Sequence, residues 1–177
     1  MKIPPNDRDL QKLMLFYKTQ ADRCGKTKAF FAGCLCLGSA LEAGLLAMAG
    51  CFEEEVREAQ TFRKASKKDL RKWNLDDLLM LASELKWIPS QIAKFRETAR
   101  AYDVHPDEAL KKGDLAYFAR MVKDIRNTIH PGNYLRKWRG TYLGKRYYEF
   151  CYTIAELVFD HLGARLEESI AQQIPRD

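Results

Sequence analysis

The sequence predicts an all-α protein, an up-and-down helical bundle of about five to seven helices. Apolar residues recur at spacings of three and four along most of the chain. Few stretches alternate with a period of two, and the hairpin dipeptides Asn-Gly and Asp-Gly do not occur. The length of 177 residues, 46% of them hydrophobic, suits one domain with a real core, so we expect a single domain over residues 1–177.

The first helix is expected over residues 7–24, where one apolar stripe has helical spacing, and Gly25 is expected to end it. The stripe consists of Leu10, Leu13, Met14, Tyr17 and Ala21. The second helix is expected from about Thr27 to Gly50. Residues 29–52 are long enough to cross a membrane, but they carry Glu42 near the centre and four glycines. Because an intramembrane carboxylate is costly, a buried central helix explains this run better than a membrane span.

The middle of the chain begins with a charged segment, residues 53–73, which we expect to be solvated and partly helical. Asn74 is a good N-cap for the helix that follows, and Asp76 and Asp77 lie in its first turn, where the helix dipole favours them. Another helix is expected from Ser90. A loop with Pro106 follows it.

The next helix is expected to start near Asp114 and to bury one apolar stripe. This stripe consists of Leu115, Phe118, Val122, Ile125 and Ile129. A polar stripe lies one residue further round the helix, about 100° away. It consists of Lys123, Arg126, Asn127 and His130. Pro131 should end this helix, since a residue before proline avoids the α conformation. We expect a basic loop after it and a last helix over about residues 143–172.

Charge and cysteine content narrow the classes of protein without selecting one. The net charge of +6 permits binding to a polyanion but does not require it. The five cysteines include one C-x-C pair, but no C-x-x-C pair and no second pair at zinc-finger spacing. We therefore expect free, buried thiols and no metal site. The N-terminal residues lack the apolar region of a secretory signal, and we expect a reducing, cytoplasmic location.

Two interpretations of the polar stripe are open. In the functional one, Arg126 binds a phosphate with its fork of donors, His130 transfers a proton near neutral pH, and Asn127 orients the substrate. These are the parts needed for metal-free cleavage of a phosphodiester. In the structural one, the same side chains interact with carbonyl groups at the helix C-terminus. Glu42 also needs a partner if it is buried, and Arg126 or a basic residue of the loop can supply it.

The segment after Pro131 is a candidate surface for nucleic acid, together with Lys123. Its aromatic and basic residues are interleaved, which suits stacking and phosphate contacts with a single strand. The candidates are Tyr134, Arg136, Lys137, Trp138 and Arg139. In the alternative interpretation, the apolar members pack the loop onto the bundle while the cations face water.

The stretch "VKDIRNTIHPGNYLR", preceded by "GSALEAGLLAMA" and followed by a long closing helix, resembles the HEPN superfamily (higher eukaryotes and prokaryotes nucleotide-binding). The resemblance covers most of residues 10–170. It implies an up-and-down bundle that forms dimers, with an Arg/His motif from each subunit at a shared cleft. Active members are ribonucleases that need no metal or other cofactor, often in toxin–antitoxin, defence or RNA-processing systems.

On this resemblance, His130 would act in acid/base transfer, Arg126 would hold the scissile phosphate and Asn127 would support the geometry. The family motif usually has four to six residues between arginine and histidine, whereas three intervene here. Two functions therefore remain. One is a homodimeric, metal-independent endoribonuclease of toxin–antitoxin or defence type. The other is a non-catalytic HEPN-like module that binds RNA, a nucleotide or a protein partner such as an antitoxin-type nucleotidyltransferase.

Overall fold

The computed structural model describes residues 5–89, 115–137, 139 and 142–173. These residues form α-helices and two short 3₁₀ turns, with no strand among them, which confirms the all-α class. The helices are α1 (Pro5–Lys26), α2 (Phe30–Cys51), α3 (Glu53–Glu58), α4 (Gln60–Lys64), α5 (Leu75–Glu84), α8 (Leu115–Arg126), α9 (Pro131–Lys137) and α10 (Lys145–Gln173). The helix expected from Ser90 and the loop around Pro106 lie outside the described residues.

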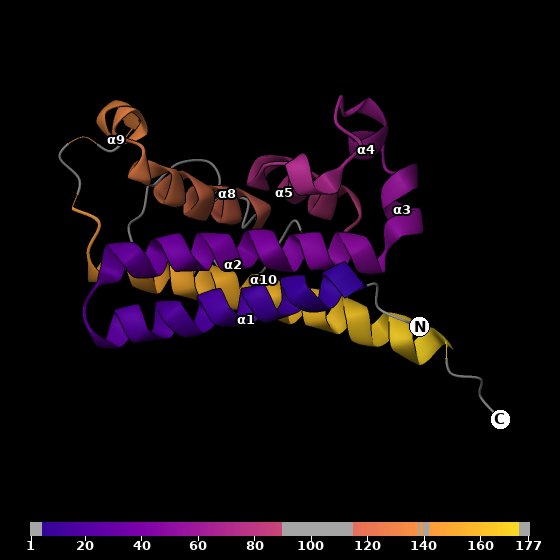
Figure 1. Ribbon diagram of the computed structural model, residues 1–177, viewed down its shortest axis with the longest axis horizontal. Helices are drawn as coiled ribbons and strands as arrows, with labels where there is room; N and C mark the ends of the chain where they lie inside the picture. Colours follow the sequence, from indigo (N-terminus) through magenta and orange to yellow (C-terminus); the bar gives the residue numbers. More distant parts are fainter. Residues whose placement is uncertain (1–4, 90–114, 138, 140–141, 174–177) are drawn as a thin grey trace.

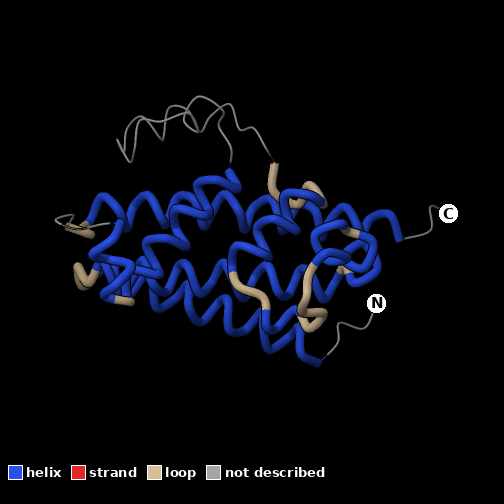
Figure 2. The backbone as a smooth tube through the Cα atoms, turned by 90° about the horizontal axis from the view of Figure 1, so that it is seen from above, coloured by secondary structure: helices blue, strands red, loops and turns tan. Residues whose placement is uncertain are grey.

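Helix α2 is the centre of the bundle. Figure 1 shows α1 and α10 on one side of it and α5 and α8 on the other; Figure 2 gives the view from above. By length and composition α2 could cross a membrane, but its leucines Leu37, Leu41 and Leu45 are at most 1% exposed among these neighbours. Its small residues allow close packing: a Cβ at Gly44 would lie 3.1 Å from both Met14 Sδ and the Phe159 ring. The structure agrees with the expected core helix.

The charged segment after α2 folds back onto α5. It contains α3, α4 and the 3₁₀ turn η1 (Leu70–Lys72), so it holds more helix than expected. Glu84, the last residue of α5, accepts hydrogen bonds from the backbone N–H groups of Gln60 (2.5 Å) and Thr61 (2.9 Å). At the other end of α5, Asn74 and Asp77 form a reciprocal capping box, which confirms the expected helix start.

The end of α8 differs from expectation. The α-helix stops at Arg126 and tightens into a 3₁₀ turn, η2 (Asn127–Ile129). Ile129 is consequently 58% exposed, although the stripe placed it in the core, and Thr128 is buried instead. The change from 3.6 to about 3.0 residues per turn rotates the side chains after Arg126 out of the α-helical register.

Pro131 begins a helix, whereas the sequence predicted only a stop and a basic loop. It is the first residue of α9, where a missing N–H costs nothing and the fixed φ of proline suits a helix. His130 precedes it in an extended conformation, with φ of −85° and ψ of 115°. The His130 carbonyl accepts hydrogen bonds from the N–H groups of Asn133 and Tyr134, in the first turn of α9.

Candidate functional site

Arg126 forms an ion pair with the carboxylate of the central helix. Its Nη1 lies 2.7 Å from Glu42 Oε2, and the two side chains are 31% and 24% exposed. The aliphatic part of Arg126 crosses α2 at Gly38, where an added Cβ would lie 2.8 Å from Arg126 Cδ and 2.9 Å from its Cβ. Glu42 thus has the partner that the sequence predicted for it. Only glycine at position 38 leaves room for the arginine stem.

Lys123, one turn earlier on α8, forms a second ion pair between helices. Its Nζ contacts Asp76 Oδ2 in the first turn of α5, and it lies 3.6 Å from Asp124 Oδ1. The Lys123 side chain is only 16% exposed. Together, Lys123 and Arg126 connect α8 to α5 and α2, so both cations of the polar stripe are paired with carboxylates.

Asn127 and His130 occupy the junction between α8 and α9. The Asn127 carbonyl accepts hydrogen bonds from the His130 N–H (3.1 Å) and from Asn133 Nδ2 (3.3 Å). The His130 side chain is exposed and makes no hydrogen bond or ion pair with the described part of the chain. Because η2 intervenes, Arg126 and His130 are not related by the α-helical stacking that their spacing predicted. The fold brings them to the same end of α8.

The candidate residues for nucleic acid separate into two groups. Tyr134 is half-buried and packs against the core, as the alternative interpretation expected, whereas Leu135 is 60% exposed. Arg136 and Arg139 are exposed, and Arg136 Nη2 donates to Asn133 Oδ1 at 2.6 Å. Trp138 and the Lys137 side chain lie outside the described residues.

Tyr142 was not among the predicted residues, although its side chain is 86% exposed. Its ring lies over Gly144, where an added Cβ would be 2.5 Å from a ring carbon. An aromatic ring so exposed offers a stacking surface for a base. The only sequence signal was its place in the basic segment.

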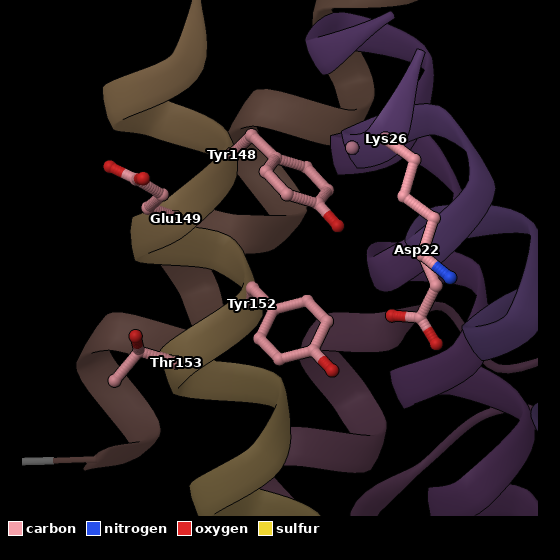
Figure 3. Close-up of a pocket in the computed structure, with 7 residues that line it drawn as sticks. Asp22, Lys26, Tyr148, Glu149, Tyr152 and Thr153 are labelled. Atoms are coloured by element: carbon pink, nitrogen blue, oxygen red, sulfur yellow. The ribbon is translucent and has the colours of Figure 1, made fainter. Parts of the chain in front are cut away.

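A second feature of the surface is an open cleft of about 620 Å³ between α1 and α10. Figure 3 shows Tyr148 and Tyr152 of α10 pointing toward Asp22 and Lys26 of α1. Burial, followed by the negative charge of Asp22, raises the pKa of Tyr148 to about 12. Burial also raises the pKa of Tyr152, with the Glu156 carboxylate as the next cause. No sequence motif predicted this cleft, since its two walls are far apart in the sequence.

The chain matches no protein-family model, no curated protein and no solved structure in the three comparisons made with known proteins. The described residues themselves define the class of fold as an all-α helical bundle.

Proposed function

We propose that this chain is a HEPN-like helical module that binds single-stranded RNA at the α8–α9 end without cleaving it. The observation that carries the proposal is the 2.7 Å ion pair between Arg126 and Glu42. This ion pair shows that Arg126, the arginine that a nuclease would use to bind its substrate, is used to pack α8 against α2.

An arginine that stabilises a cleavage transition state must offer positive charge where negative charge develops. Glu42 already neutralises Arg126, and in a half-buried site its carboxylate would also repel an approaching phosphate. The short spacing between Arg126 and His130 supports the same conclusion, because acid/base catalysis depends first on geometry.

The binding part of the proposal is supported by the exposed residues after His130. Arg136 and Arg139 have no carboxylate partner among the described residues, so their charges remain available to phosphates. Tyr142 provides an exposed ring nearby in the sequence. Cations with an aromatic surface are the combination that binds single strands with little sequence preference.

Fluorescence anisotropy with a labelled oligouridylate tests the binding. The Arg136→Ala/Arg139→Ala double variant should bind several-fold more weakly. The slope of log K against log salt concentration should also be smaller than that of wild type by about 1.4. The matched control is Arg63→Ala/Lys64→Ala, which removes two exposed cations of α4. Wild-type protein without measurable affinity, or an equal loss in both double variants, would overturn the proposal.

The endoribonuclease remains a second candidate, which one observation favours. The His130 imidazole is exposed and makes no hydrogen bond with the described residues, so it is accessible to a substrate. In that reaction the ribose 2′-hydroxyl would attack phosphorus while His130 accepts its proton. The P–O5′ bond would break and the leaving oxygen would take a proton from water, which gives a cyclic phosphate and a free 5′-hydroxyl. Incubation with RNA in EDTA, comparing wild type with His130→Ala, distinguishes the two candidates.

The homodimer and the nucleotidyltransferase partner are also proposals, which rest on the HEPN resemblance. A surface that supports a protein contact is the exposed apolar set of α1, consisting of Leu13, Leu15 and Phe16. Sedimentation velocity on wild type and Phe16→Glu tests self-association. A monomeric wild type would rule out the homodimer.

A further inference from the structure

At one end of the bundle, Tyr148 holds the ends of three helices together. Its hydroxyl donates to the Ala21 carbonyl at 3.0 Å, and its ring lies 5.9 Å from that of Phe30. The ring also fills the space beside two glycines, because an added Cβ at Gly25 or Gly33 would lie within 2.7 Å of a ring atom. Tyr148 thereby fixes the end of α1 and the start of α2 against the start of α10.

This end of the molecule is strongly basic. Figure 1 places the α1–α2 turn and the start of α10 at the same end of the bundle. The exposed cations there, which we call the basic end, are Arg23, Lys26, Lys28, Arg136, Arg139, Lys145 and Arg146. The carboxylates described in the same segments are Asp22 and Glu149, of which Glu149 lies 3.3 Å from Lys145. Positive charge therefore predominates.

The backbone adds to this charge. Helices α2 and α10 both begin at the basic end, and neither has an acidic residue in its first turn. No side chain caps the N-terminus of α2. The free N–H groups and the helix dipole of such an end favour anions. Two exposed aromatic residues, Phe31 (38%) and Tyr142 (86%), lie near the starts of these two helices in the sequence.

We infer that an RNA strand bound at α9 continues across the basic end, with phosphates at Lys26 and Lys28 and a base stacked on Tyr142. The inference rests on the proposed function and extends its surface from the α8–α9 junction to the α1–α2 turn. It excludes a partner confined to α9. It gives one role to exposed cations that come from three separate segments of the chain.

Lys28 permits a sharp test, because its φ of 62° is left-handed. Glycine adopts this conformation without strain, so Lys28→Gly removes the charge without disturbing the turn. Lys86 has a φ of 57° and provides a matched control. It lies toward the opposite end of α2, since its neighbour Trp87 packs on Phe52 with ring centroids 5.7 Å apart.

The experiment compares Lys26→Ala/Lys28→Gly with Lys64→Ala/Lys86→Gly in binding a labelled oligouridylate over a range of salt. The first double variant should raise the Kd about five-fold or more and lower the salt slope by about 1.4, as two lost phosphate contacts require. The control should keep the wild-type Kd and slope. Tyr142→Ala should weaken binding about five-fold without changing the slope, because stacking releases no counterions.

Failure of the inference is distinguishable from failure of the proposed function. If Lys26→Ala/Lys28→Gly binds like wild type while Arg136→Ala/Arg139→Ala binds weakly, the RNA stays at α9 and the inference is wrong. If Tyr142→Ala binds like wild type, the stacked base is wrong. If wild type does not bind the oligouridylate, both the inference and the proposed function are wrong.

Discussion

Arg126 Nη1 and Glu42 Oε2 lie 2.7 Å apart, in a pair that joins the last turn of α8 to the middle of α2. The arginine that resembles a nuclease residue in the sequence is thus part of the helix packing. Lys123 has the same role toward Asp76 of α5. Both cations of the polar stripe of α8 are therefore engaged in ion pairs between helices.

Glu42→Gln should lower the free energy of unfolding by about 1–2 kcal/mol, because it leaves a half-buried guanidinium without its counter-charge. Urea denaturation measures the loss. The control is Glu53→Gln, which breaks an exposed pair with Arg57 and should cost less than about 0.5 kcal/mol. Equal losses in the two variants would mean that the Glu42 pair contributes no more than a surface contact.

Gly38→Ala should destabilise the protein, whereas Gly163→Ala should stabilise it by about 1 kcal/mol. Both glycines lie inside helices, where alanine is favoured by about that amount. At Gly38 the new methyl group would overlap the stem of Arg126, and overpacking costs about 1–3 kcal/mol. At Gly163 no atom lies within 4 Å of the added Cβ. Thermal unfolding of both variants measures the two signs, and a stabilised Gly38→Ala would contradict the packing described.

Tyr148→Phe should cost about 1 kcal/mol at neutral pH, since it removes the hydrogen bond to the Ala21 carbonyl. The substitution should also change how the free energy of unfolding depends on pH above pH 10. The folded pKa of Tyr148 is about 12 and its ordinary value is 10.0, so folding retains a proton that the unfolded chain loses between these values. Stability therefore falls as pH rises through this window, and less steeply in Tyr148→Phe.

The control for this prediction is Tyr142→Phe, whose side chain is 86% exposed and should not affect the curve. Urea denaturation from pH 9 to 12 gives the two slopes. Parallel curves for wild type and Tyr148→Phe would show that Tyr148 does not titrate with folding.

Glu84→Gln should lower stability at pH 7 by about 1 kcal/mol, a typical value for a lost helix cap, because the carboxylate binds the start of α4. The hydrogen bond from the Thr61 hydroxyl, followed by that from its backbone N–H, lowers the pKa of Glu84 below its ordinary value of 4.5. The contribution is therefore complete above that value and is lost as pH falls through the folded pKa. The difference from wild type should disappear in acid, whereas Glu168→Gln should match wild type throughout.

Local chemistry accounts for what the sequence predicted correctly. The start of α5 was predictable because Asn74 and Asp77 satisfy each other's backbone groups within four residues. The Glu42 pair was predictable in outline because a carboxylate in an apolar helix needs a cation. Leu115, Phe118, Val122 and Ile125 are buried as their spacing predicted.

The errors arose where one residue permits two structures or where distant segments meet. Pro131 suits the end of one helix and the first turn of another, and the sequence favoured only the former. The exposure of Ile129 depends on the 3₁₀ turn η2, which no pattern in the sequence predicted. The Tyr148 ring packs beside Gly25 and Gly33, more than a hundred residues earlier, in a contact that only the tertiary fold creates.

The most direct test of RNA binding without cleavage is to saturate labelled single-stranded RNA with wild-type protein in EDTA and to analyse the RNA after prolonged incubation. We expect a salt-sensitive complex from which the RNA is recovered intact, with the same result for Arg126→Ala and His130→Ala. Fragments ending in a cyclic phosphate, formed by wild type and absent with His130→Ala, would contradict it and establish the nuclease.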